Sequence, residues 1–312
     1  MRTPKRRPRF ERVPTRNFRL TDRDLAIIEN VEQYRLLNSE QIVALLGEGS
    51  AQHVRRRLQL LFHNRFLDRP PVQIADFYRT PGTLPMVYGL GNRGADALAD
   101  HLRRDRSKGD WATKNRSIRS TFFHHTLMVS SIMVAFEVSC RNHEAVRLIP
   151  WEEILETCPD ETRRLKHPLT WHVRVPDIGS LGVTPDRVFG LEFVNRPRSR
   201  RRSYFFLEAD RASMPVIRKD LRGTSIFRKL LAYQATAAQK LHSERFGINN
   251  FRVLTVTRSP KQERVTSMVD AAQQLSGPQG ILLFSDIESL STGDALTHEW
   301  TNGRGESVRL LD

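Results

Sequence analysis

The chain has 312 residues, of which 39% are hydrophobic, and this length and composition fit two globular domains and exclude a wholly disordered chain. Fifty Lys and Arg residues oppose 35 Asp and Glu residues, and the formal charge of +15 favours a polyanionic partner, nucleic acid first. Cys140 and Cys158 are too few and too distant to predict a disulfide framework or a zinc site. With no run of 18 apolar residues and no signal peptide, we expect a cytoplasmic protein without a membrane span.

The amino-terminal segment is rich in arginine and proline and has few apolar groups to bury. This composition predicts a disordered basic arm over residues 1–19, which could lie along DNA.

The next segment has the pattern of three short helices followed by two strands. Thr21, Ser39 and Ser50 stand where helices begin, and apolar residues then recur at helical spacing, the third helix running to about Asn64. Extended segments follow at residues 66–67 and 86–94. Three helices and two strands predict a winged-helix domain over residues 20–104.

The third of these helices has the pattern of a recognition helix. Its inward stripe consists of Val54, Leu58, Leu61 and Phe62. The side chains predicted to face outward, and to contact the grooves or phosphates of double-stranded DNA, are Gln52, His53, Arg55, Arg56 and Gln59. A basic face used for binding protein is the alternative.

Residues 105–120 are polar, charged and without periodicity, so they predict a linker. Beyond it, residues 121–312 have the element order helix, three strands, helix, strand, helix, strand, which predicts a mixed α/β domain.

The stretch from Thr184 to Arg211 is the most informative about function, because it contains several carboxylates between apolar runs. Its two apolar runs read as the strands of a β-hairpin that places Asp186 at the start of one strand and both Glu208 and Asp210 at the end of the next. Converging carboxylates suit a hard divalent cation, so all three are candidate ligands for Mg²⁺ or Mn²⁺ in a catalytic site. A chance occurrence of such a spacing is the alternative.

Further residues complete a candidate nuclease site. Lys229 and Tyr233 lie on one face of the following helix and are candidate catalytic groups. The hairpin loop supplies arginines for backbone phosphates, namely Arg198, Arg200, Arg201 and Arg202, with Arg196 beside them. Glu153 is either an accessory acidic ligand or a solvated charge beside Trp151.

The runs LTDRDLAIIENVEQYRLLNSEQIVALL, HVRRRLQLLFHNRFLDR, YGLGNRGADAL, HHTLMVS, TPDRVFGL, FFLEADR and KLLAY carry a resemblance over roughly residues 20–290. The chain resembles the replication-relaxation family of plasmid and mobile-element proteins, which is similar to MOBC-type relaxases. The resemblance implies a winged helix followed by a PD-(D/E)xK nuclease-like domain, and metal-dependent nicking of DNA at a replication or transfer origin.

By this resemblance Asp186 matches the PD aspartate and Glu208 the central acidic position, whereas Asp210 stands where the nuclease pattern has lysine. In that superfamily the lysine is known to migrate, so Lys229 is the candidate replacement. Two functions stay open: a relaxase-like endonuclease, and a non-catalytic DNA-binding protein that controls plasmid replication, copy number or transcription through a degenerate nuclease domain. Other replication or transfer proteins and a second copy of the chain are further candidate partners.

Overall fold

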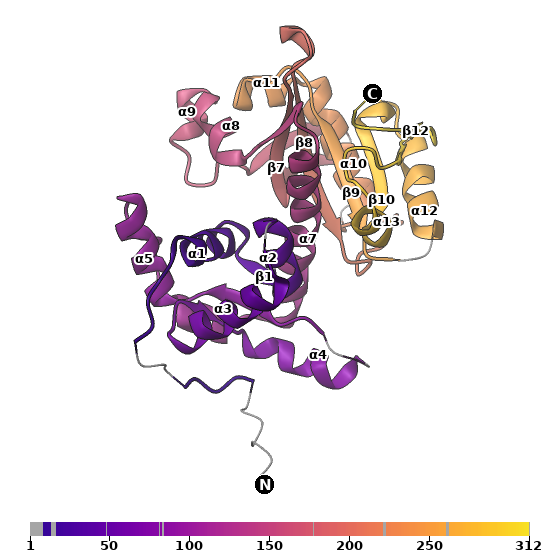
Figure 1. Cartoon of the computed structure of the whole chain (residues 1–312). Coiled ribbons are helices and arrows are strands. Elements are labelled where there is room, and N and C mark those ends of the chain that lie inside the picture. The colour runs from indigo at the N-terminus through magenta and orange to yellow at the C-terminus, as the bar shows by residue number, and fades with distance from the viewer. Residues whose placement is uncertain are drawn as a thin grey trace. The chain divides into compact units, whose positions relative to one another are not determined.

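The chain is a mixed α/β protein made of two compact units, Met1–Val134 and Ala135–Asp312 (Figure 1). The computed structural model describes residues 9–13, 17–47, 49–80, 82, 84–176, 178–220, 223–259 and 262–311. The division falls inside a long helix, α7 (Ser120–Asn142), and not at the segment 105–120 that the sequence suggested as a linker.

The first unit combines helices with a small antiparallel sheet of strand order β1-β3-β2. Its elements before α7 are α1 (Asp22–Tyr34), β1 (Leu36–Asn38), α2 (Ser39–Leu46), α3 (Ala51–His63), β2 (Leu67–Asp68), a 3-10 turn η1 (Pro71–Gln73), α4 (Ile74–Arg79), β3 (Val87–Leu90), α5 (Asn92–Leu102) and α6 (Trp111–Arg116). The three expected helices and the two expected strands are therefore present, and the short strand β1 joins them.

Local capping explains where the first helices begin. Thr21 and Asp24 form a reciprocal capping box at the start of α1, as the sequence predicted for Thr21. The second helix differs from the prediction, because Asn38 and not Ser39 is its N-cap. The side-chain oxygen of Asn38 accepts from the backbone of Gln41 at 2.8 Å, and the Gln41 carboxamide oxygen accepts from the backbone of Asn38 at 2.7 Å.

Part of the predicted basic arm lies against the first unit. Arg12 donates to the carbonyl oxygen of Phe62 and pairs with Asp68, and the backbone N–H of Val13 donates to His63 Nδ1 at 3.1 Å. The expectation of disorder is therefore wrong for residues 9–13, because cation–π, ionic and backbone contacts fix them. Residues 1–8 and 14–16 of that arm lie outside the described residues.

The predicted linker is likewise partly structured. It contains α6, whose Asn115 is 1% exposed and donates to the carbonyl oxygen of Leu90 at 2.8 Å. Arg35 in turn donates to the Asn115 carboxamide oxygen at 2.8 Å. Composition alone hid this segment, because one buried asparagine among charged residues leaves no apolar periodicity to detect.

Two glycines let the start of α5 lie close to the backbone between α3 and β2. A Cβ at Gly91 would lie 2.4 Å from the carbonyl oxygen of Arg65, and one at Gly94 would lie 2.2 Å from that of Phe66. Any larger residue would force these backbones apart. The YGLGNRG run thus encodes a close packing of α5 on the segment that precedes β2.

Helix α7 is apolar and long enough to be a candidate membrane span by length and composition, with 44% of its tested window buried inside the protein. Its hydroxyl groups have protein partners. Ser130 donates to the carbonyl oxygen of Tyr34 at 3.0 Å, and Ser139 accepts from the backbone of Ala295 at 2.7 Å. These contacts are those of a core helix, and a core helix can also have the length and apolar composition of a membrane span.

The second unit is built on a seven-stranded mixed sheet of order β12-β11-β10-β9-β8-β7-β4. Its elements after α7 are β4 (Val146–Ile149), α8 (Trp151–Thr157), α9 (Asp160–Arg163), β5 (Trp171–Val175), β6 (Gly179–Val183), β7 (Arg187–Phe193), η2 (Arg198–Arg200), β8 (Arg202–Asp210), α10 (Ile226–Ala238), α11 (Leu241–Phe246), β9 (Arg252–Thr257), α12 (Gln262–Gln273), η3 (Gln279–Ile281), β10 (Leu282–Asp286), α13 (Ile287–Thr292), β11 (Trp300–Asn302) and β12 (Ser307–Val308). The mixed α/β class predicted from the sequence is confirmed.

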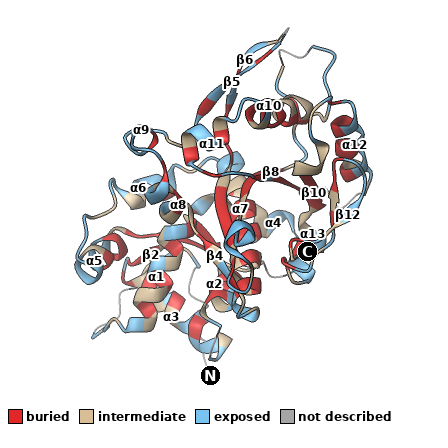
Figure 2. Cartoon of the chain, turned by 90° about the horizontal axis from the view of Figure 1, so that it is seen from above, coloured by how far each residue is buried: buried red, intermediate tan, exposed pale blue. Residues whose placement is uncertain are grey.

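The topology places β8 in the interior of this sheet, between β7 and β9. It pairs antiparallel with β7 and parallel with β9, and the crossover between β8 and β9 contains α10. Buried residues are concentrated on these strands, as Figure 2 shows for β8 and β10. Trp171 of the separate hairpin β5-β6 packs against Phe206 and Tyr233, so that hairpin, which the sequence analysis did not predict, covers part of the core beside α10.

Candidate functional site

The candidate site lies at one end of the hairpin β7–β8. Arg187 pairs with Leu207 across the hairpin, so Asp186, immediately before β7, reaches the carboxyl end of β8. The backbone N–H of Asp186 donates to the Leu207 carbonyl at 2.9 Å, and the Asp186 carboxylate accepts from the backbone N–H of Ala209 at 2.8 Å. The structure thus brings Asp186 beside Glu208, as the hairpin prediction required.

Glu208 is the centre of this cluster. Its residue is 4% exposed, and each carboxylate oxygen accepts one side-chain hydrogen bond. Lys229 Nζ donates to Oε2 at 2.5 Å, and Tyr233 Oη donates to Oε1 at 2.5 Å. Both donors come from α10, where residues four positions apart lie on the same face, one helical turn from each other. Ser225 fixes the start of that helix by accepting from the backbone of Arg228.

Burial and neighbouring charges set the protonation of the cluster. Burial raises the pKa of Glu208, the Lys229 ammonium opposes this rise, and the Asp186 carboxylate adds to it, so that the pKa lies above its ordinary value. Burial alone would lower the pKa of Lys229, but the attraction of Glu208, Asp186 and Asp210 outweighs it and raises that pKa. Burial also raises the pKa of Tyr233 well above its ordinary value, so the phenol keeps its proton and donates it.

The cluster is open to solvent at the lysine. The Lys229 side chain is 41% exposed, whereas that of Glu208 is 6% exposed. Tyr233, which the sequence marked as a candidate catalytic group, is 1% exposed, so its phenol cannot contact a phosphate directly. Its place in the site is to position Glu208.

Asp210 has other partners. Arg264 of α12 holds it in a two-pronged ion pair, with Nε to Oδ2 at 2.6 Å and Nη2 to Oδ1 at 3.0 Å, and the Thr257 hydroxyl donates to Oδ2 at 2.9 Å. The side chains of Asp210 and Arg264 are 4% and 16% exposed. The charge of the buried Asp210 carboxylate is therefore compensated within the fold by Arg264.

The partners of the three carboxylates decide which of them could bind the expected Mg²⁺ or Mn²⁺ ion. Among the described residues, no three His, Cys, Asp or Glu side chains are grouped so that they could hold a metal ion. A site using Asp186, Glu208 and Asp210 together is thus not formed, because Arg264 engages the third carboxylate. The remaining pair offers the hard oxygen donors that Mg²⁺ and Mn²⁺ prefer, so cation binding by Asp186 and Glu208 remains a prediction.

The hairpin arginines do not belong to this cluster. Arg198 and Arg200 lie in η2 and Arg201 and Arg202 directly follow, all of them exposed, but the turn is at the opposite end of the hairpin from the carboxylates. The length of β7 separates the two ends by roughly 20 Å at the usual rise of a strand. These arginines could contact DNA, but they could not clamp a phosphate at Glu208.

Glu153, the candidate accessory ligand, belongs to a different network. Its carboxylate is bound by Arg147 at 2.6 and 2.8 Å, and Arg147 also bridges to Glu192, which pairs with Arg202. The surface-charge alternative therefore describes Glu153.

The predicted recognition helix has the expected faces. Val54, Leu58, Leu61 and Phe62 are buried. Arg57, between the two faces, pairs with Asp24 of α1. The predicted DNA-contacting side chains all line one open surface depression and are exposed: Gln52, His53, Arg55, Arg56 and Gln59. Contact of this face with DNA stays a prediction.

The sequence reasoning missed Arg264 and Thr257. Arg264 lies more than 50 residues beyond Asp210, and nothing in its local spacing marks it as a partner. Only the parallel pairing of β8 with β9, which sets Asp210 opposite Thr257, brings these residues together.

Fold and site define a mixed α/β protein whose central strands end in a cluster of carboxylates and a lysine. Residues 28–251 match the model of the replication-relaxation family. Because this match spans most of the 312 residues, the chain belongs to the replication-relaxation family. The match includes Asp186, Glu208, Lys229 and Tyr233, and ends before Arg264. No curated protein and no solved structure matches the chain. Membership of this family indicates a role in the replication of a mobile element.

Proposed function

We propose that the protein is a relaxase-like DNA endonuclease that nicks one strand at a replication or transfer origin, with Asp186, Glu208 and Lys229 as its catalytic residues. The observation that carries the proposal is the 2.5 Å contact between Lys229 Nζ and Glu208 Oε2. A lysine absent from its usual place in the strand is supplied by the next helix, and it reaches the same carboxylate from there.

The chemistry requires charge stabilisation at the phosphate. Asp186 and Glu208 would hold a divalent cation, Mg²⁺ or Mn²⁺, which when bound supplies positive charge for the phosphate oxygens and for an attacking water. The Lys229 ammonium, partly exposed, adds a second positive charge where negative charge develops in the transition state. Tyr233 holds the Glu208 carboxylate in place by its hydrogen bond.

Recognition of double-stranded DNA is proposed for the first unit, acting as a winged helix. Its exposed α3 face presents two arginines, Arg55 and Arg56, which can bond guanine edges or phosphates, and two glutamines, Gln52 and Gln59, which can bond adenine. The exposed arginines around η2 offer a further phosphate-binding surface. A protein with this role acts in the cytoplasm.

The second candidate is a DNA-binding protein without catalysis that controls replication, copy number or transcription. Two observations favour it: Asp210, paired with Arg264, stands at the position of the usual lysine, and both oxygens of Glu208 already accept hydrogen bonds. The two candidates share DNA binding and differ in strand cleavage.

A nicking assay separates them. Supercoiled DNA carrying the element's own origin is incubated with Mg²⁺ or Mn²⁺ and with wild type, Asp186→Ala or Glu208→Ala, and the open-circular product is measured. Glu153→Ala is the matched control, since its carboxylate belongs to an exposed ion pair. We expect nicking by wild type and the control, and its loss in the two site variants. Equal inactivity of all four proteins would leave the non-catalytic function.

A further inference from the structure

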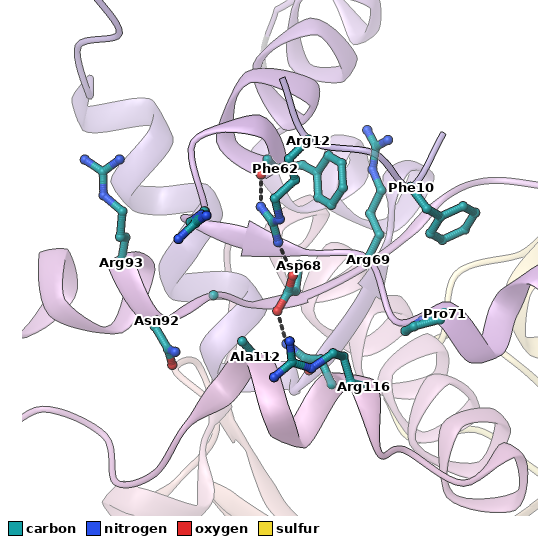
Figure 3. Close-up of a pocket in the computed structure, with 13 residues that line it drawn as sticks. Phe10, Arg12, Phe62, Asp68, Arg69, Pro71, Asn92, Arg93, Ala112 and Arg116 are labelled. Atoms are coloured by element: carbon teal, nitrogen blue, oxygen red, sulfur yellow. Dashed lines mark hydrogen bonds and ion pairs between the residues drawn. The ribbon is translucent and has the colours of Figure 1, made fainter. Parts of the chain in front are cut away.

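The first unit contains a pocket of about 580 Å³ that is separate from the carboxylate cluster (Figure 3). Its wall brings together the end of α3, strand β2, the start of α5, helix α6 and the segment of residues 10–12. One acidic residue, Asp68, lines it, together with five arginines: Arg12, Arg65, Arg69, Arg93 and Arg116.

Aromatic rings and backbone groups fix three of these arginines. The guanidinium carbons of Arg12 and Arg69 lie 4.3 and 4.1 Å from the centroid of the Phe62 ring, and that of Arg93 lies 4.5 Å from the Phe66 ring. Arg93 also donates to the carbonyl oxygen of Asn64 at 3.0 Å. Guanidiniums held in this way lose little conformational freedom when they bind a ligand.

The charges in the pocket do not balance. The Asp68 carboxylate already has two partners: it pairs with Arg12, and it accepts a hydrogen bond from the Asn115 carboxamide at 3.2 Å. Among the described residues, the other four arginines have no ion-pair partner, and the Arg65 side chain has no hydrogen-bond partner. Burial first, and then the nearby charges of Arg65 and Arg69, lower the pKa of Arg12 despite its pairing with Asp68. An anion in the pocket would relieve this repulsion.

We propose that this pocket binds a phosphate group carried by a nucleotide or by a DNA strand. Guanidinium groups bind phosphate through paired, charge-assisted hydrogen bonds, and five arginines line this pocket. The volume falls in the range of sites that hold small ligands of nucleotide size. The site lies on other residues than the nicking site and the outer face of α3, and it stands whether or not the chain cleaves DNA.

The test replaces two exposed arginines of the pocket. Arg65→Glu with Arg116→Glu reverses two charges without touching the Phe62 stack. Arg79→Glu with Arg119→Glu is the matched control, because these arginines are also exposed in the first unit but do not line the pocket. Calorimetric titration uses deoxyadenosine 5′-monophosphate, deoxyadenosine, and a short single-stranded oligonucleotide with or without a 5′-phosphate.

We expect phosphate-bearing probes to bind the wild type, deoxyadenosine not to bind, and the pocket variant to lose at least about tenfold in affinity, with the control much less affected. Binding of the monophosphate and of only the 5′-phosphorylated strand would assign a terminal phosphate. Binding of both strands without the monophosphate would assign a backbone phosphate. Failure of every phosphate probe to bind, or equal weakening in both variants, would overturn the proposal. Should the charge reversal unfold the unit, Arg65→Gln with Arg116→Gln tests the same contacts.

Discussion

Replacing Arg264 with Met should destabilise the second unit strongly, because it removes the partner of a buried carboxylate. Asp210 would keep its hydrogen bonds from Thr257 and from the backbone of Ala212, but it would lose both bonds to the guanidinium. Breaking a buried pair by deleting one partner costs about 3–5 kcal/mol. The two remaining donors place the expected loss near the lower end, about 3 kcal/mol.

The assay is urea unfolding followed by tryptophan fluorescence in a Trp111→Phe background. This leaves Trp151, Trp171 and Trp300, which all report on the second unit. Arg163→Met is the control: Arg163 also pairs with an aspartate, Asp160, but their side chains are 47% and 60% exposed, so a loss below about 1 kcal/mol is expected.

A double-mutant cycle measures the interaction between Asp210 and Arg264 directly. Asp210→Asn removes the charge that needs Arg264, so the double variant should lose less stability than the sum of the single variants, with a coupling of roughly 2 kcal/mol. If Arg264→Met cost less than about 1 kcal/mol, or if the two effects simply added, Asp210 would not depend on Arg264 for its burial. Asp210 would then again be a candidate cation ligand.

Three further outcomes follow from the site and from α3. Because the pKa of Glu208 is raised, Mn²⁺ binding should increase with pH as Glu208 loses its proton. Lys229→Met should move this increase to higher pH, since it removes the ammonium that opposes the raised pKa. A pH profile of Mn²⁺ binding that Lys229→Met leaves unchanged would contradict the coupling between Lys229 and Glu208. Tyr233→Phe should cost about 1.5–3 kcal/mol of unfolding free energy, the value of a hydrogen bond to a charged group, and leave DNA affinity unchanged; weaker DNA binding with normal stability would instead place the phenol against a phosphate. Arg55→Ala and Arg56→Ala should each weaken DNA binding and reduce the slope of log affinity against log salt by about 1, whereas an unchanged slope would move DNA contact away from α3.

The sequence predicted the elements whose signal is local. The helices α1 to α3, the buried stripe of α3 and the hairpin β7–β8 follow from helical spacing and alternating apolar runs, and the start of α1 follows from its capping residue Thr21. The proximity of Asp186 and Glu208 then followed from the hairpin itself, because two antiparallel strands joined by a turn must bring those positions together.

What the sequence did not predict depends on contacts between distant segments. The ion pair of Asp210 with Arg264 requires the parallel pairing of β8 and β9 and the placement of α12, none of which has a local signature. The burial of Asn115 in α6 is similar, since a polar residue in a charged segment gives no sign that it will be enclosed. The η2 arginines lie in the hairpin turn, as the sequence predicted, but the length of the strands separates them from the carboxylates.

The most direct test of the account is the rate of origin nicking by Lys229→Met in Mg²⁺, measured beside wild type and Lys219→Met. Lys219 is exposed in the same unit and is the matched control. Loss of a group that stabilises charge in the transition state predicts a rate lower by about 10²–10³ for Lys229→Met, with the control close to wild type. Nicking by Lys229→Met at the wild-type rate would contradict the catalytic role of the lysine that α10 brings to Glu208.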